Sequence, residues 1–196
     1  DDFATAVKTA VERYGASRVG VFIGTSTAGI LQTELAYRRH DPVTGALPPD
    51  FNYRGTHSTF SVADFTSHYF DLTGPAVVVS SACSSSAKVF SSARRMLAAC
   101  FIDAAVVGGV DSLCLTTLYG FNSLGLLSGQ ACRPFDANRN GISIGEAAAF
   151  ALLERLPEHL DADAVLLLGV GESSDAYHIS SPHPEGLGAR MAMQDA

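Results

Sequence analysis

Residues 80–87, Ser-Ser-Ala-Cys-Ser-Ser-Ser-Ala, contain the side chain best suited to nucleophilic chemistry, the thiol of Cys83. A continuous apolar run over residues 76–79 precedes this segment, and apolar residues at helical spacing follow it from residue 87. Cys83 is therefore expected on a tight strand-to-helix turn, with its sulfur at the helix N-terminus. Free N–H groups and the helix dipole favour a thiolate there, and small neighbours leave room for an exposed nucleophile.

The same local pattern also fits a structural cysteine at a helix start, with the three following serines acting as ordinary capping residues. The residues around Cys83 do not by themselves separate the two interpretations.

The other cysteines, Cys100, Cys114 and Cys132, form no Cys-x-x-Cys pair and have no histidine at zinc-finger spacing. We therefore expect no metal site. Cys100 and Cys114 lie in apolar stretches, where a buried free thiol is the common state, and we expect burial to make all three less reactive than Cys83. This cysteine usage favours a reducing cytoplasm.

The elements that position Cys83 follow from the hydrophobic periodicity. Helical spacing predicts helices over residues 3–14 and 60–70, and from residue 87 to 101. Residues 40–57 contain three prolines and no steady periodicity, which predicts a long surface excursion. Continuous apolar runs predict short buried strands over residues 19–23, 76–79 and 104–110.

Further strands are expected at about residues 147–156 and 165–170, and a last helix begins within residues 185–196. The stretch from residue 76 to 110 forms a strand–turn–helix–strand unit. Alternating strands and helices predict an α/β layered fold with a mixed, mostly parallel sheet flanked by helices.

The composition excludes several classes of protein. The 196 residues are 47% hydrophobic, too apolar for a disordered chain. A net charge of −7 repels a phosphate backbone, so nucleic acid is not an expected ligand. The longest charge-free stretch, residues 112–132, is too polar to span a membrane, and no signal peptide is visible. Only 17% of residues are charged, against roughly 25% in average domains, which suggests surface covered by a partner half, a dimer interface or both.

Several short motifs occur together in a fixed order along the chain. They are Leu72-Thr73-Gly74-Pro75, Ser81-Ala82-Cys83-Ser84-Ser85-Ser86, Val107-Gly108-Gly109-Val110-Asp111, Leu127-Ser128, Arg133-Pro134-Phe135-Asp136 with Arg139 and Gly141, Gly145-Glu146, and Ser174-Asp175-Ala176-Tyr177-His178. In this order and spacing the chain resembles the β-ketoacyl-acyl-carrier-protein synthases, the condensing enzymes of fatty acid and polyketide synthesis in the thiolase-like superfamily. The resemblance covers nearly the whole chain.

The resemblance implies a thiolase-like layered fold, of which this chain is one half of a duplicated αβαβα architecture. Residues 1–196 would be the synthase N-terminal domain, truncated at both ends and without the C-terminal domain. In the family the C-terminal half carries two catalytic histidines, a lysine and a Gly/Phe-rich loop that completes the oxyanion hole. We therefore expect this chain alone to be inactive, and none of its six histidines is assigned a proton-transfer role.

The resemblance also implies the reaction. An acyl group passes from acyl carrier protein to the Cys83 sulfur as a thioester, and decarboxylation of a malonyl thioester then yields a carbanion that attacks it. The Cys83 N–H is the expected oxyanion donor. No metal or organic cofactor is implied. The expected partners are acyl carrier protein, acyl and malonyl thioesters, and a second subunit in a homodimer or a ketosynthase-like heterodimer, all in the cytoplasm.

Further residues match family positions around the acyl-chain pocket: Thr27, Tyr53 and Phe121, with Tyr53 reaching in from the dimer partner. Ordinary core packing fits these side chains equally well. Asp136, Arg139 and Glu146 are expected to form a local charged network that supports the turn at Cys83 without taking part in chemistry.

Two alternative functions remain open. The first is a non-catalytic partner subunit that determines chain length in a ketosynthase heterodimer, and the presence of Cys83 weighs against it. The second is a Cys-dependent acyl hydrolase or transferase of unrelated mechanism, which would need a general base within this chain.

Overall fold

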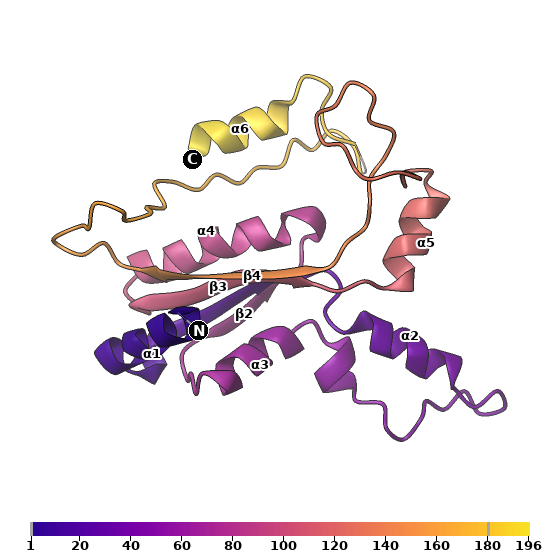
Figure 1. Ribbon diagram of the computed structural model, residues 1–196, viewed down its shortest axis with the longest axis horizontal. Helices are drawn as coiled ribbons and strands as arrows, with labels where there is room; N and C mark the ends of the chain where they lie inside the picture. The colour runs from indigo at the N-terminus through magenta and orange to yellow at the C-terminus, as the bar shows by residue number, and fades with distance from the viewer. Residues whose placement is uncertain (1, 180) are drawn as a thin grey trace.

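A four-stranded sheet with the order β2-β1-β3-β4 forms the centre of the computed structural model, which describes residues 2–179 and 181–196. The central strand β1 (Val19–Gly24) pairs in parallel with β2 (Ala76–Val79) and with β3 (Ala104–Asp111). The last strand, β4 (Ala147–Glu154), pairs antiparallel with β3. The predicted mixed, mostly parallel sheet is therefore confirmed, and Figure 1 shows it edge-on between helices.

Helices cover both faces of this sheet because its strands are apolar on both sides. On one face, α1 (Asp2–Tyr14) and α3 (Ser61–Tyr69) pack against alternate residues of β1 and β3. On the other face, α4 (Ser85–Ala98) packs against Phe22 and the intervening residues of β3. The alternation follows from the pleat, which points successive side chains to opposite faces. All six residues of β1 are buried.

The remaining helices lie outside this three-layer core (Figure 1): α2 (Ile30–Arg38), α5 (Leu115–Ser123) and α6 (Leu187–Asp195). Glu34 of α2 holds the start of α5, since its carboxylate accepts the first two backbone N–H groups of that helix at 2.9 and 2.7 Å. Partial burial raises the pKa of Glu34, but these hydrogen bonds outweigh it and lower the pKa overall.

Most predicted elements are confirmed, and two expectations are wrong. Residues 165–170 form no strand among the described residues, and β2 is an edge strand whose residues are only half-buried or exposed. Helices α2 and α5 were not predicted, because their apolar residues form no clear stripe. The excursion over residues 40–57 is a loop that ends in a π-helical turn, Tyr53–His57.

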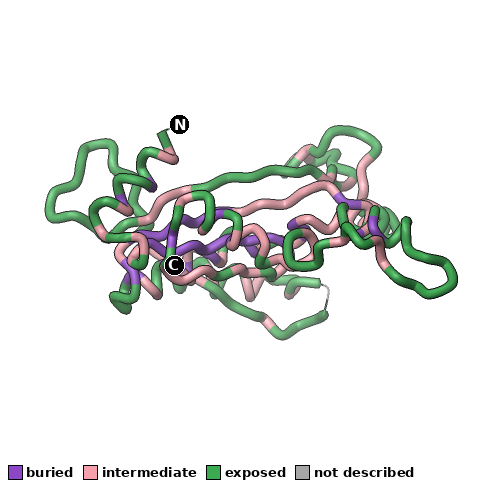
Figure 2. The backbone as a smooth tube through the Cα atoms, turned by 90° about the horizontal axis from the view of Figure 1, so that it is seen from below, coloured by how far each residue is buried: buried purple, intermediate pink, exposed green. Residues whose placement is uncertain are grey.

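The molecule exposes a large surface for its mass. Its accessible surface is 12839 Å², whereas a compact 20.5 kDa protein exposes roughly 9,000 Å². Figure 2 shows burial confined largely to the central strands and the helix faces against them. The first four residues of β4 are exposed, including Phe150. This exposed apolar surface agrees with the low fraction of charged residues. Both features are typical of a surface that a partner covers. No helix in the described part of the chain is long and apolar enough to cross a membrane.

Candidate active site

Three segments that follow the parallel strands meet at one edge of the sheet. Thr25, Ser26 and Thr27 follow β1, Cys83 follows β2, and Asp111 is the last residue of β3. Because these strands are parallel, their carboxyl ends lie together, and this edge is where open α/β sheets bind ligands. The candidate nucleophile therefore lies where the fold favours a site.

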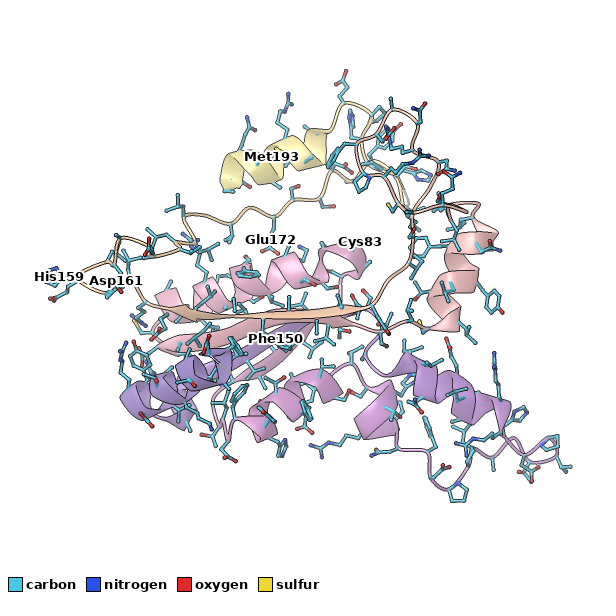
Figure 3. The ribbon with its side chains drawn as sticks, in the orientation of Figure 1. Cys83, Phe150, His159, Asp161, Glu172 and Met193 are labelled. Atoms are coloured by element: carbon cyan, nitrogen blue, oxygen red, sulfur yellow. The ribbon has the colours of Figure 1, made fainter. Side chains whose placement is uncertain are left out.

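Cys83 occupies a short 3₁₀ turn, η3 (Ala82–Ser84), that runs directly into α4. The thiol is exposed, and the preceding Ala82 has a left-handed backbone with φ of +52°. An L-residue adopts this conformation at a cost of about 1 to 2 kcal/mol, so neighbouring contacts must hold the turn. The predicted strand–turn–helix around Cys83 is confirmed, and Figure 3 shows the residue at the start of α4.

Two glycines let α4 approach the sheet at this turn. A Cβ on Gly24 would lie 2.4 Å from the Ser85 carbonyl carbon, and one on Gly109 would lie 2.1 Å from the Ser86 hydroxyl. Both distances are shorter than heavy atoms tolerate, so the first turn of α4 rests on strand ends that lack side chains. Gly109 belongs to the motif after the helix, and its physical role here is close packing.

Asp111 ties the segment after β1 to the end of β3. Its Oδ1 accepts hydrogen bonds from the Ser26 N–H at 2.7 Å, the Thr27 N–H at 3.0 Å and the hydroxyls of Thr25 and Thr27 at 3.2 and 3.1 Å. The sequence placed Asp111 in a motif without assigning it a role. Its neighbours are hydroxyl residues some 85 positions away, so only the folded sheet brings them together.

The three residues expected around an acyl pocket lie in three separate segments of the chain: after β1, in the π-helical turn and on α5. Thr27 is buried, and its hydroxyl is used by Asp111 and by the Ser112 N–H at 2.8 Å. Tyr53 is exposed and stacks on His57 in the π-helical turn. Phe121 is half-buried on α5 and lines a shallow hollow of about 370 Å³ there. No hydrogen bond joins any of the three to Cys83 among the described residues.

Two larger hollows flank the first turns of α4. One, of about 500 Å³, lies between α4 and the β3–β4 pair and is lined by Ser86, Phe90 and Phe150 among others. The other, of about 690 Å³, lies between α4, residues 167–173 and α6. Cys83 lines neither hollow, although its neighbours Ser84 and Ser86 each line one.

A partly exposed cluster of charged and hydroxyl side chains joins α4 to the extended segment that crosses it. Glu172 accepts hydrogen bonds from Ser91 at 2.7 Å, Arg95 at 2.9 Å and Lys88 at 2.9 Å. The hydrogen bond from Ser91, followed by those from Arg95 and Lys88, lowers the pKa of Glu172 from 4.5 to about 2. This carboxylate fixes the segment over α4 (Figure 3).

Two of the other cysteines differ from expectation. Cys114 is buried, as predicted, but Cys100 and Cys132 are exposed. Helix α4 ends at Ala98, and Cys100 follows with φ of +61°, in the left-handed position of a Schellman turn in which the Phe101 N–H bonds the Met96 carbonyl. The expectation that burial protects every cysteine except Cys83 is therefore wrong.

The expected charged network near the turn is also wrong. Arg139 donates to the backbone carbonyl of Asp136, and Glu146 accepts the Leu113 N–H at 3.0 Å. No ion pair joins the three side chains within the described ranges, and Arg139 and Glu146 are exposed, so no buried charge requires pairing. Arg139 and Glu146 instead form hydrogen bonds with backbone groups.

Neither a metal-binding cluster nor a histidine hydrogen-bonded to Cys83 is found in the part of the chain that the structure describes. No group of three or more His, Cys, Asp or Glu side chains there has metal-binding geometry. No histidine bonds Cys83 either: His57, for example, faces Thr33 at 3.3 Å, and His68 faces the Asp64 carbonyl at 2.7 Å.

Comparison with known proteins places these features in context. Residues 4–159 match the family profile of the β-ketoacyl synthase N-terminal domain. The chain is 31% identical to 3-oxoacyl-[acyl-carrier-protein] synthase 2 of Vibrio cholerae, over 95% of its own length and 47% of that protein. It is 34% identical to nodulation protein E of Rhizobium meliloti, over 90% of its length and 44% of that protein. The chain thus spans about half the length of these curated relatives.

The fold has a similar counterpart among solved structures. A ketosynthase in complex with its chain length factor, from Xenorhabdus doucetiae, superposes with a TM-score of 0.82 and 38% sequence identity, over 98% of this chain and 48% of that one. The overall arrangement of the sheet and its helical layers thus occurs in a solved structure of this kind.

Proposed function

Because the chain belongs to the β-ketoacyl synthase family through its N-terminal domain, we propose that it is the N-terminal half of a β-ketoacyl-acyl-carrier-protein synthase whose nucleophile is Cys83. The observation that carries this proposal is the exposed Cys83 thiol on a strained turn at the start of α4, at the carboxyl edge of the sheet. Cys114, in contrast, is buried, and Cys100, which is also exposed, follows the opposite end of α4.

The proposed reaction has two covalent steps. In the first, the Cys83 thiolate attacks the carbonyl carbon of an acyl thioester on acyl carrier protein, and the carrier leaves as its thiol after taking a proton. In the second, a malonyl thioester loses CO₂, and the resulting carbanion attacks the Cys83 thioester. The new C–C bond forms as the C–S bond breaks, which releases the β-ketoacyl product and returns the thiolate.

Cys83 would serve this reaction twice. Its sulfur is the acyl carrier, stabilised as a thiolate by the N-terminus of α4. Its backbone N–H is a donor to the oxyanion that forms on the acyl carbonyl, and among the described residues this N–H has no hydrogen-bond partner. The groups that activate the malonyl unit would come from the C-terminal half of the full-length synthase.

The acyl pocket is proposed to include Thr27, Tyr53 and Phe121, with Tyr53 contributed to the site of a second subunit. Its exposure in this single chain, 62% of the residue, leaves it available to such a partner. We expect Tyr53→Ala in the full-length synthase to shift products toward longer acyl chains, because a larger apolar cavity admits a longer chain. Product analysis by mass spectrometry checks this, with Tyr37→Ala, an exposed tyrosine on α2, as the matched control. An unchanged product profile at normal activity would contradict the assignment.

A second candidate is a non-catalytic subunit that determines chain length beside a catalytic partner. The solved structure most relevant to it contains a ketosynthase together with a chain length factor. Such a subunit needs no nucleophile, so an accessible cysteine on a strained turn favours the catalytic assignment.

The test is condensation by the full-length synthase with acyl- and malonyl-carrier protein. We expect Cys83→Ala to reduce β-ketoacyl product formation by at least about 1000-fold, as loss of a covalent nucleophile does. Cys100→Ala, which removes the exposed thiol at the other end of α4, should retain normal activity. Equal, measurable activity of Cys83→Ala and wild type would contradict the assignment of Cys83 as the nucleophile, whereas no condensation by the wild-type protein alone would favour the chain-length subunit.

A further inference from the structure

We propose that Ser26 and Ser85 are positioning residues that aim the Cys83 N–H, by holding the carbonyl of Ala82 from two directions. This inference rests on the proposed function of Cys83 as the acyl-accepting nucleophile. It assigns a role to the hydroxyl of Ser26, which belongs to none of the quoted motifs, and a more specific role than helix capping to that of Ser85.

The Ala82 carbonyl receives more hydrogen bonds than a turn requires. The Ser85 hydroxyl donates to it at 2.6 Å, the Ser26 hydroxyl donates at 3.1 Å, and the Ser85 N–H also bonds it. One of these donors comes from the segment after β1, 56 positions away in the chain. A carbonyl held by both its own turn and a second strand end cannot rotate freely.

Holding this carbonyl fixes the direction of the Cys83 N–H. The Ala82 carbonyl and the Cys83 N–H belong to one planar trans peptide unit and point in opposite directions. Ala82 lies in the left-handed region with φ of +52°, so relaxing to another orientation would lower the free energy of this peptide. The two serines oppose that relaxation and keep the free N–H pointed away from them.

The two serines that hold the Ala82 carbonyl are themselves held in place by the sheet and the turn. The Ser26 N–H donates to Asp111 at 2.7 Å, and Asp111 ends β3. The Ser85 hydroxyl is almost fully buried and also accepts the Ser81 N–H at 2.9 Å, so it bridges both sides of Ala82. A donor held in advance by rigid elements stabilises a developing oxyanion without reorganising during the reaction.

Ser84 provides a natural control in the same turn. Its hydroxyl bonds only Ser81, to the backbone carbonyl at 2.9 Å and to the side chain at 3.0 Å. It therefore holds the turn without touching the Ala82 carbonyl. The variant Ser84→Ala therefore tests whether the loss of any serine near Cys83 slows acyl transfer.

The experiment measures two reactions of Cys83 in the full-length synthase. Transfer of an acyl group from acyl carrier protein forms an oxyanion, whereas alkylation by iodoacetamide displaces iodide at a saturated carbon and forms none. For Ser26→Ala and Ser85→Ala we expect acyl transfer to slow about 10-fold each, and about 100-fold in the double variant, while alkylation stays within about twofold of wild type. Ser84→Ala and Ser26→Thr, which keeps the hydroxyl, should transfer acyl groups at close to the wild-type rate.

Three results would overturn the inference. Equal losses in acyl transfer and alkylation would show that the serines only maintain the turn, and unchanged acyl transfer in the double variant would show that they do not aim the N–H. A wild-type protein whose Cys83 is alkylated but accepts no acyl group would overturn the proposed function and this inference with it. If Ser85→Ala does not fold, the pair Ser26→Ala and Ser26→Thr decides the question, because Ser26 is only half-buried.

Discussion

Two exposed cysteines lie at opposite ends of one helix, where the helix dipole has opposite signs. Cys83 precedes the N-terminus of α4 and Cys100 follows its C-terminus. In general, a helix N-terminus attracts negative charge and a C-terminus repels it. Iodoacetamide reacts with the thiolate, so we expect Cys83 to be alkylated about tenfold faster than Cys100. Peptide mapping after limited treatment of the full-length synthase measures this ratio.

The control for that experiment is the same protein unfolded in urea, where the helix is lost and the two rates should become similar. Labelling of Cys100 or Cys132 ahead of Cys83 in the folded protein would contradict the proposed role of the helix N-terminus.

Glu172 makes stability depend on pH. Its pKa is about 2 in the folded protein and 4.5 ordinarily, so its stabilising contribution is complete above pH 4.5 and disappears as the pH falls toward 2. The side chain is 30% exposed, so solvent screening reduces the expected contribution to about 1 to 2 kcal/mol. Glu172→Gln should lower the free energy of unfolding by that amount at pH 7, and the difference should shrink between pH 4.5 and pH 2.

Urea denaturation of both proteins across this pH range measures the difference. Glu158→Gln, in the exposed loop, should behave as wild type throughout. A Glu172→Gln difference that is constant with pH would show that the carboxylate charge is not what stabilises the cluster.

At the residue scale, local sequence predicted what lies within one turn and missed what lies across the sheet. The position of Cys83 on a strand-to-helix turn was predicted because the strand, the small residues and the helix are consecutive in the sequence. Ser26 and Asp111 were not, because their contacts join segments 56 and 85 positions apart. The exposure of Cys100 was missed because apolar spacing continues to Phe101, whereas the helix ends at Ala98.

At the scale of elements, the approach of α4 to the sheet depends on missing side chains. In Gly24→Ala the new Cβ would lie about 2.5 Å from backbone atoms of Ser85 and Ser86, so the start of α4 must shift. We expect a loss of about 1 to 3 kcal/mol in the free energy of unfolding, together with slower acyl transfer to Cys83. Urea midpoints and single-turnover acylation measure the two effects.

The matched control is Gly120→Ala within α5, where a Cβ meets no atom within 4 Å. A helix-interior glycine replaced in open space should stabilise the protein by about 0.5 to 1 kcal/mol. Equal effects of the two substitutions would show that the close approach at Gly24 does not limit packing.

Hydrophobic patterns predicted some strands correctly and others not, depending on their neighbours in the fold. Strands β1 and β3 were predicted because they are buried on both faces and therefore continuously apolar. Residues 165–170 are also an apolar run but pair with no strand among the described residues, and Val165 and Leu168 are 98% and 85% exposed. An apolar run specifies a strand only when the fold supplies a partner. Helix α5 was missed because Gly120 and its threonines weaken the helical signal.

At the scale of the whole molecule, the chain has a large exposed surface. It exposes 12839 Å², about 40% more than a compact protein of its mass. The exposed face of β4 and the two hollows beside α4 border the turn that carries Cys83. A second half packed there would cover apolar surface and enclose the thiol at once, which agrees with a match to about half of each curated relative.

The most direct test of this account is the site of acylation in the full-length synthase. The protein is incubated with an acyl thioester of acyl carrier protein and without a malonyl unit, then digested, and the peptides are mapped by mass spectrometry. The account predicts one acyl group on the peptide that contains Cys83, and its disappearance when malonyl-carrier protein is added, as the β-ketoacyl product forms. An acyl group on Cys100, Cys114 or Cys132, or no covalent acyl group on a protein that still forms product, would contradict it.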